Sequence, residues 1–138
     1  DRGRIPFMTV FLDANIVMYV IGAPHEYRDR SQVLLDQLIV SGTRLVTDVE
    51  VFQEILHRYG AINRRDAIEP AFALLHDLVD EVFTVGLAEI ETAKDIVLGH
   101  GSGARDALHV AAMRSHDVAR ILTFDRGFDR FNDLERIH

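Results

Sequence analysis

The sequence predicts an α/β fold built around a mainly parallel sheet of four to five strands. Short runs rich in β-branched residues alternate with longer amphipathic segments, an order that favours parallel strands joined by helices. The first run, residues 9–12, is continuously apolar, as expected of a strand buried on both faces. The 138 residues contain no internal repeat, low-complexity stretch or linker, so the chain is expected to form one domain.

The first half of the chain is expected to contain two strands and three helices. They are the strand 9–12, helices over 15–21 and 28–40, the strand 45–47 and a helix that follows Asp48. Gly22 and Pro24 should end the first helix, Gly42 lies just beyond the second, and Asp48 is a favourable N-cap for the third. The apolar faces assigned to the second and third helices are Val33, Leu34, Leu38 and Ile39, and Val51, Phe52, Ile55 and Leu56.

The second half is expected to contain three helices and two or three strands. In order, these are a helix over 63–79, a strand over 82–85, helices over 87–98 and 104–116, a strand over 121–124 and a short last strand within 134–137. Gly99 should end the second of these helices, and the Gly-Ser-Gly segment 101–103 should form a loop.

Composition excludes several classes of site. The chain has no cysteine, so disulfides, thiolate catalysis and cysteine-ligated zinc are absent. Its net charge of −7 argues against a broad nucleic-acid-binding surface, so activity on RNA would need divalent metal or a local rim of arginines. No apolar run approaches the roughly 18–20 residues of a membrane span, and a cytoplasmic location without a membrane partner is expected. Residues 1–7 are expected to be a cloning remnant or an upstream extension, with the domain over 8–138.

Four carboxylates are candidates for one metal site. Asp13 and Asp125 each follow an apolar strand, and sites in parallel sheets form beyond the carboxyl ends of the strands. Glu54 lies on a helix between apolar neighbours, and Asp106 lies in the first turn of another helix. Carboxylates brought together repel one another and raise one another's pKa. A hard divalent cation such as Mg²⁺ or Mn²⁺ would offset that cost and support phosphodiester hydrolysis.

Each acid also has an ordinary structural interpretation when it is taken alone. Asp13 could simply cap the next helix, and Asp125 could be a turn residue. Asp106 could be a helix-terminal acid and Glu54 a surface charge. Glu50 lies one turn before Glu54 and is its rival for the glutamate role. The metal-site hypothesis therefore depends on all four acids acting together.

These segments resemble the PIN-domain family and, within it, the VapC-type toxins. The matching segments are residues 11–15, 47–54, 105–111 and 122–129, which together span nearly the whole chain from Met8. The resemblance implies a three-layer α/β/α fold with a central parallel sheet and a site for Mg²⁺ or Mn²⁺. It assigns both metal-binding and catalytic roles to the four acids Asp13, Glu54, Asp106 and Asp125.

The resemblance also assigns supporting roles. Asn15 matches a polar position that supports the first acid, and Thr123 matches a hydroxyl position before the last acid. Asp129 is expected to be an additional outer-shell acid. Asp48 stands where a serine or threonine is more usual, and we expect it only to cap its helix.

Basic residues near the acids have open roles. His109 lies three residues after Asp106, on the same helix face, and is expected to pack or to support the site. Arg105 and Arg126 could contact RNA phosphates, or they could, like Arg130, simply pair with the acids.

The expected function is that of a metal-dependent endoribonuclease, the toxin of a toxin–antitoxin pair, which hydrolyses RNA phosphodiester bonds. The resemblance further implies a homodimer and a small VapB-like antitoxin, which inserts a C-terminal segment near the metal site.

Other functions remain alternatives. A haloacid-dehalogenase-type phosphatase needs a second aspartate two residues after the first and a lysine, whereas position 15 is Asn15 and the one lysine is Lys94. A response-regulator-like domain needs an acid pair and a lysine at strand ends, and flap nucleases carry more acids and long basic insertions. A non-catalytic PIN-fold interaction module would be distinguished by Mn²⁺ titration.

Overall fold

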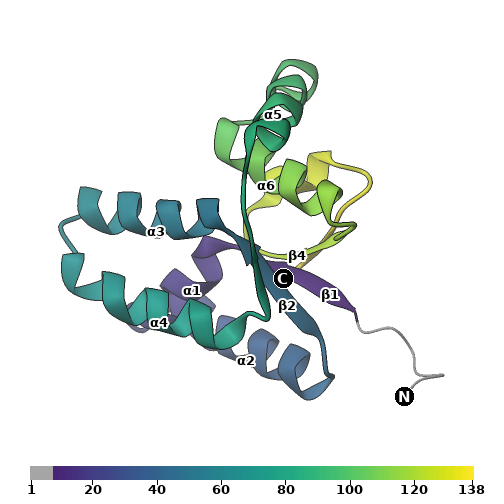
Figure 1. Cartoon of the computed structure of the whole chain (residues 1–138). Coiled ribbons are helices and arrows are strands. Elements are labelled where there is room, and N and C mark those ends of the chain that lie inside the picture. Colours follow the sequence, from purple (N-terminus) through teal and green to yellow (C-terminus); the bar gives the residue numbers. More distant parts are fainter. Residues whose placement is uncertain (1–7) are drawn as a thin grey trace.

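The computed structural model describes residues 8–138, in which five parallel strands form one sheet with helices on both sides (Figure 1). The elements in chain order are β1 (Thr9–Leu12), α1 (Ala14–Ile21), α2 (Glu26–Val40), β2 (Arg44–Asp48), α3 (Val49–Ala61), the 3₁₀ turn η1 (Arg65–Ala67), α4 (Ile68–Leu78), β3 (Glu81–Phe83), α5 (Leu87–His100), α6 (Ala104–Ser115), β4 (Arg120–Leu122), the 3₁₀ turn η2 (Arg126–Arg130) and β5 (Glu135–Ile137). The predicted α/β class and all five predicted strands are confirmed. The interpretation of residues 1–7 lies outside the described residues.

The strand order is β3-β2-β1-β4-β5, and every neighbouring pair is parallel. Strand β1 is central, so its residues are covered by both helical layers, and Val10, Phe11 and Leu12 are fully buried. The register pairs Phe11 with Val46 of β2 and with Ile121 of β4. The carboxyl ends of β1, β2 and β4 therefore meet at one edge of the sheet.

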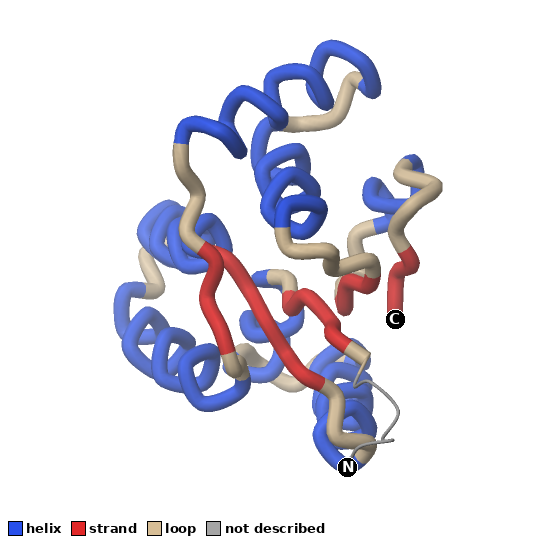
Figure 2. Tube along the Cα trace, turned by 45° about the vertical axis from the view of Figure 1, so that its right-hand side comes forward, coloured by secondary structure: helices blue, strands red, loops and turns tan. Residues whose placement is uncertain are grey.

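Two groups of helices form the outer layers (Figure 2). Helices α1 to α4 contact one another, whereas α5 packs mainly against α6. The chain moves in one direction across the sheet from β1 to β3 and then returns past β1 to β4. Right-handed crossovers in both directions place α5 and α6 on the face opposite α1 to α4, which gives three layers. Within residues 8–138 no helix is long and apolar enough to cross a membrane.

The predicted apolar face of α2 is confirmed at Leu38, which is buried, and at Leu34, which packs against the core, but it is wrong at Val33 and Ile39. Val33 and Ile39 are 54% and 53% exposed, whereas the buried positions are Ser31, Leu35 and Leu38. The spacing of four and then three residues fits a single helical stripe, which the small Ser31 joins because its hydroxyl donates a hydrogen bond to the carbonyl of residue 27. Because one buried position is occupied by the polar Ser31, the pattern of apolar residues did not fully indicate which face is buried.

The helix predicted over 63–79 is interrupted. Asn63 has a φ of 57°, a left-handed conformation that cannot continue a helix, and η1 precedes α4, which begins at Ile68. On α3, Leu56 is 47% exposed although it was assigned to the buried side. Val51 and Ile55 are buried as predicted, and Tyr59 rather than Leu56 completes the buried face.

Two further boundaries differ from prediction. Helix α5 continues through Gly99 to His100 and ends because Gly101 adopts a φ of 68°, the left-handed conformation that favours glycine. Strand β4 ends at Leu122 rather than Phe124. The Thr123 backbone N–H still donates to Ile137 of β5, but its hydroxyl accepts the backbone N–H of Asp125, and the chain turns after it.

Candidate active site

All four predicted acids line one cavity of about 190 Å³ at the carboxyl edge of the sheet, and Arg58 and Arg105 line it as well. The acids come from different elements, because Asp13 directly follows β1, Glu54 lies on α3 and Asp106 on α6. Asp125 begins the turn η2, three residues beyond β4. Residues up to 112 positions apart in the chain therefore share one cavity, as the parallel topology predicted.

Asp13 is the most buried of the four acids, with 5% of its surface exposed. One carboxylate oxygen, Oδ1, accepts the backbone N–H of Ala14 at 2.8 Å, so Asp13 also caps α1. Burial raises the pKa of Asp13 to about 6, although the nearby His109 opposes the shift. The protein thus holds a desolvated carboxylate that costs free energy unless a cation compensates its charge.

A short polar network fixes the second oxygen of Asp13. The Thr123 hydroxyl donates to Asp13 Oδ2 at 2.8 Å, and it accepts the Asn15 side-chain amide at 2.9 Å. The same hydroxyl accepts the backbone N–H of Asp125 at 3.0 Å. Asn15 and Thr123 thus lie where the sequence placed supporting residues, and they connect the first acid to the turn that carries the last.

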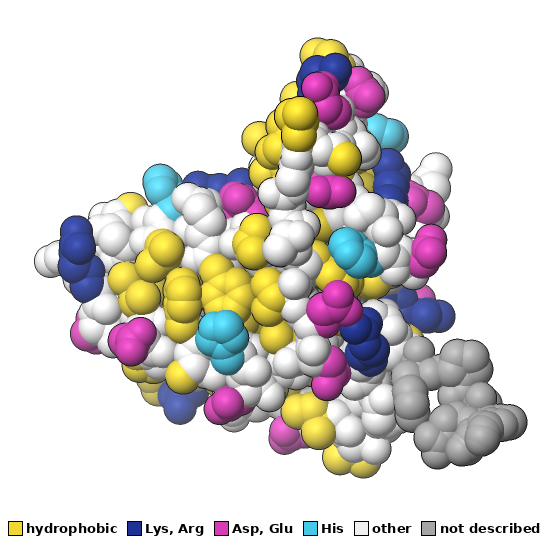
Figure 3. Space-filling view, viewed as in Figure 1, with side chains coloured by type: hydrophobic (Ala, Val, Ile, Leu, Met, Phe, Trp, Pro, Cys, Tyr) yellow, Lys and Arg dark blue, Asp and Glu magenta, His cyan; other side chains and the backbone are white. Residues whose placement is uncertain are grey.

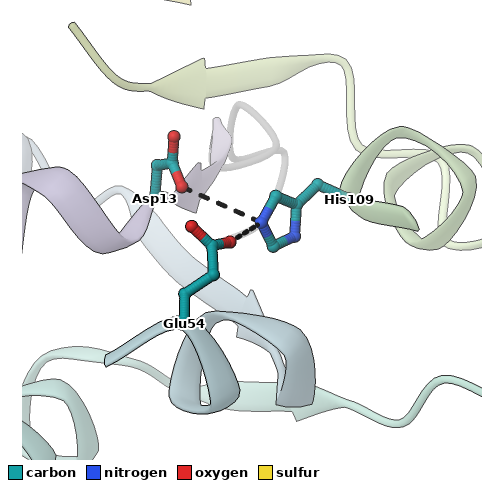
Figure 4. Close-up of side chains that lie close together, drawn as sticks. All are labelled: Asp13, Glu54 and His109. Carbon is teal, nitrogen blue, oxygen red and sulfur yellow. Dashed lines mark hydrogen bonds and ion pairs between the residues drawn. The ribbon is translucent and has the colours of Figure 1, made fainter. Parts of the chain in front are cut away.

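His109 lies between the acids (Figure 4). Its Nδ1 atom is 2.7 Å from Asp48 Oδ2, its Nε2 atom contacts Glu54 Oε1, and Nε2 is 3.9 Å from Asp13 Oδ1. The ring is 1% exposed and packs against Phe11 at a centroid distance of 5.3 Å. Burial alone would lower the pKa of His109, but Asp48, Glu54 and Asp13 together hold that pKa well above its usual range. The imidazolium therefore balances part of the acidic charge.

The expectation that Asp48 only caps α3 is wrong. Its Oδ1 atom does cap the helix, accepting the N–H of Val51 at 2.9 Å, but its Oδ2 atom binds His109. Asp48 is fully buried, so this second contact satisfies an oxygen that would otherwise be desolvated without a partner. The capping motif concealed the second role in the sequence.

Asp106 and Asp125 form the more open part of the cavity. Burial raises the pKa of Asp106, and the neighbouring charge of Asp125 adds to the shift. Asp125 Oδ1 accepts the N–H of Gly127 at 2.8 Å. A β-carbon at Gly127 would lie 3.0 Å from Asp125 Oδ1 and 3.4 Å from Asp106 Oδ2, so glycine allows both carboxylates to approach the turn.

Of the remaining predicted residues, Arg105 lines this cavity, whereas Arg126 and Asp129 are not among its lining residues. Arg105 places its Nε atom 3.9 Å from Glu50 Oε2, and Arg126 begins η2 directly after Asp125. Asp129 forms an ion pair with Arg136 at 2.9 Å, and its role as an outer-shell acid stays a prediction.

Arg130 and Arg58 complete the basic residues of this region. Arg130 donates to the Gly127 carbonyl at 3.1 Å. Arg58, which the sequence interpretation overlooked, lies one turn after Glu54 on α3, and this spacing is the signal that could have identified it.

The donor set fits a hard divalent cation. Asp13, Glu54 and His109 place one ligand-type atom each within 4.8 Å of one another, but the protonated His109 has no free lone pair, so the carboxylates are the donors that would hold the ion. Carboxylate oxygens dominate, and such ligands suit oxygen-preferring cations. The raised pKa values of Asp13 and Asp106 record the electrostatic cost that a bound cation would remove.

Comparison with known proteins agrees with this arrangement. A family model described as the PIN domain matches residues 10–134. The chain is 46% identical over 129 residues to Ribonuclease VapC13 of Mycobacterium tuberculosis, an alignment that covers 93% of this chain and 98% of the relative.

Two solved structures share the fold. The toxin VapC20 of Mycobacterium tuberculosis has a TM-score of 0.74 at 20% identity, with 89% of this chain and 95% of that one covered. The VapBC-1 structure from nontypeable Haemophilus influenzae has a TM-score of 0.66 at 20% identity, with coverage of 94% and 97%. The family match, the identity over almost the full length and the shared fold lead to one conclusion: the chain belongs to the PIN-domain family and, within it, to the VapC group.

Proposed function

We propose that this protein is a metal-dependent endoribonuclease that hydrolyses RNA phosphodiester bonds and acts as the toxin of a toxin–antitoxin pair. The observation that carries the proposal is the single cavity lined by Asp13, Glu54, Asp106 and Asp125. The identity to relatives named as ribonucleases, over nearly the whole chain, supports RNA as the substrate class.

The four acids would hold Mg²⁺ or Mn²⁺. When bound, such a cation supplies activation of water and neutralisation of the charge that develops on the phosphate. The network of Asn15 and Thr123 orients Asp13, which keeps its carboxylate from rotating away from the cavity. His109 holds Glu54 and Asp48 in place through its two ring nitrogens and limits repulsion among the acids.

The rim of the cavity would bind the RNA backbone. Arg58 and Arg105 line the cavity beside the acids and can neutralise phosphates on either side of the bond that is cleaved. Arg126, at the start of η2, would add a further contact. Outer-shell support from Asp129 is also part of the proposal.

The partners follow from the VapC group. The named VapBC-1 structure shares this fold, which supports a VapB-like antitoxin as the partner. A homodimer of the toxin and an antitoxin segment near the acid cavity are further parts of the proposal. The functional domain would be residues 8–138, and its site of action would be the cytoplasm.

Cleavage of total bacterial RNA, followed by sequencing of the new ends, tests the proposal. Wild-type protein should produce discrete ends in Mg²⁺ or Mn²⁺ and none in EDTA. Asp106→Asn should lose cleavage by at least about a hundredfold, because it removes one ligand charge. Asp95→Asn is the matched control, because Asp95 is an exposed aspartate on α5, and it should cleave like wild type. Equal cleavage by Asp106→Asn, or none by wild type, would overturn the proposal, and the second result would favour a non-catalytic interaction module.

A further inference from the structure

A second cavity adjoins the acid cavity and has a different chemical character. Its volume is about 320 Å³, and it shares Asn15, Met18 and Arg58 with the acid cavity as a common wall. The two cavities therefore form one continuous depression over α1 and α3. We call the second part the arginine–tyrosine groove, after the residues that distinguish its lining: Tyr19, Arg58, Tyr59 and Arg64.

Two arginines line this groove. Arg58 is exposed on α3 at the junction with the acid cavity, and Arg64 lies beyond the C-terminal end of the same helix, where its Nε atom pairs with Asp66 Oδ1 at 3.1 Å. Burial raises the pKa of Tyr59, while the charges of Arg64 and Arg58 oppose that shift, so both guanidinium groups act on one wall. On the face shown in Figure 3, by contrast, Lys and Arg side chains are dispersed among acids. A polyanion would therefore find a local positive surface next to the acids.

An aromatic ring stands at the junction with the acids. Tyr19 lies one helical turn after Asn15, and its ring meets that of Phe124 edge to face at 5.7 Å. Phe124 in turn stacks on Tyr27 at 4.4 Å and directly precedes Asp125. Tyr19 also meets Tyr27 edge to face and stacks on His25, both at 5.3 Å, so the surrounding rings hold it in a fixed position in the wall of the groove.

We propose that the arginine–tyrosine groove binds one unpaired nucleotide of the RNA next to the phosphodiester that is cleaved. Its base packs against Tyr19, and its phosphate is bound by Arg58, with Arg64 further along the backbone. This inference rests on the proposed ribonuclease function and names its substrate form as single-stranded. A base in a duplex is stacked between its neighbours and cannot reach a side-chain ring, whereas an unpaired base can. The groove is of the size that suits a small ligand.

Charge favours RNA over a protein segment in this groove. A cationic protein segment would be attracted by the acids but repelled by Arg58. A phosphate group, which is negatively charged, would be attracted by the arginines and repelled by the acids. The acid cavity and the arginine–tyrosine groove adjoin each other. One RNA strand can therefore place its cleaved phosphodiester at the acids and the neighbouring phosphate at the arginines.

The experiment measures binding of a labelled single-stranded RNA that spans the mapped cleavage site. The host is the Asp106→Asn protein, which should bind without cleaving, and the readout is fluorescence anisotropy at several salt concentrations. Arg58→Gln should weaken binding about tenfold and reduce the slope of log affinity against log salt by about 0.7, the value for one phosphate contact on a single strand. Tyr19→Leu should weaken binding by about tenfold with an unchanged salt slope, and Tyr19→Phe should retain it.

Controls separate the possible outcomes. Arg120→Gln removes an exposed arginine at the opposite end of the sheet and should leave affinity unchanged. A duplex of the same sequence should compete about tenfold more weakly than the single strand. If wild type cleaves RNA but both groove variants bind and cleave normally, the groove proposal fails and the ribonuclease proposal stands. If the variants lose only inhibition by an antitoxin, the groove belongs to a protein partner. If wild type neither binds nor cleaves RNA, both proposals fail.

Discussion

The Nδ1 atom of His109 lies 2.7 Å from Oδ2 of Asp48, and this contact joins helix α6 to the end of strand β2 inside the protein. The two residues are 61 positions apart and both are almost completely buried. The pair connects the helical layer of α6 to the sheet, and His109 also contacts Glu54 of the acid cavity. It therefore couples the stability of the fold to the geometry of the site.

Replacing Asp48 tests this coupling. Asp48→Ala removes the cap of α3 and leaves the His109 ring with an unpaired nitrogen, so the free energy of unfolding should fall by about 3 kcal/mol. Asp48→Asn keeps one oxygen to cap α3 but places an amide NH2 group, a donor, against His109 Nδ1, so it should lose the histidine contact alone and about half as much free energy. Urea denaturation checks both values. Equal losses in the two variants would contradict a shared role for the cap and the histidine contact.

The buried Asp13 predicts a specific pH dependence of stability in the metal-free protein. Its folded-state pKa is raised to about 6 by burial. A carboxyl that holds its proton more tightly in the folded chain loses stability as the pH rises through its unfolded pKa, near 4, to its folded pKa. At neutral pH the ionised group costs as much as about 3 kcal/mol.

Asp13→Asn should therefore be more stable than wild type in EDTA at neutral pH, by about 1–3 kcal/mol. The difference should shrink toward zero below about pH 4, where Asp13 is protonated in both states. Urea denaturation of both proteins across the pH range provides the measurement. A difference that does not change with pH would show that the burial of Asp13 carries no electrostatic cost.

The Thr123 hydroxyl predicts an effect on metal binding at a position that is not itself a ligand. Thr123→Val removes a donor to Asp13 and an acceptor for two N–H groups. We expect a loss of about 2 kcal/mol in the free energy of unfolding and about a tenfold loss of Mn²⁺ affinity. Thr123→Ser retains the hydroxyl and should restore the affinity. If serine and valine weaken Mn²⁺ binding equally, the hydroxyl does not orient Asp13.

The close approach at Gly127 predicts loss of activity with little loss of stability. In Gly127→Ala the new methyl group would lie 3.0 Å from Asp125 Oδ1, so the carboxylate must move. RNA cleavage should fall by about tenfold, while the free energy of unfolding changes by less than about 1 kcal/mol. Gly99→Ala is the matched control, because a β-carbon there meets nothing within 4 Å, and it should stabilise α5 by about 0.5–1 kcal/mol. Full activity in Gly127→Ala would show that Asp125 tolerates displacement.

Much of this architecture could be predicted because the relevant signals are local. The apolar runs fixed the strands, and acids directly after strands are brought to one edge by parallel pairing, which is why Asp13 and Asp125 were placed together. Asp106 and Glu54 were assigned to the same site because their segments occur in the order typical of the PIN-domain family. The α2 face was partly misassigned because its stripe includes Ser31, and the end of β4 was misassigned because the chain turns after Thr123, whose hydroxyl accepts the N–H of Asp125.

The remainder depends on contacts between distant residues. His109 could be placed on the helix face of Asp106, but its position between Asp48 and Glu54 depends on how α6 packs over α3. Asp48 has an ordinary capping signature that gives no sign of a second partner. The spacing of four residues from Glu54 places Arg58 on the same helix face, but only the cavity shows that this face meets the other acids.

Calorimetric titration with Mn²⁺ near neutral pH tests the central claim that the four acids form one metal site. Wild type should bind, and affinity should fall at least about tenfold in each of the variants Asp13→Asn, Glu54→Gln, Asp106→Asn and Asp125→Asn. Glu50→Gln, which removes the rival glutamate one turn away, should stay within about twofold of wild type. Absence of binding to wild type, or unchanged affinity in all four variants, would contradict the account.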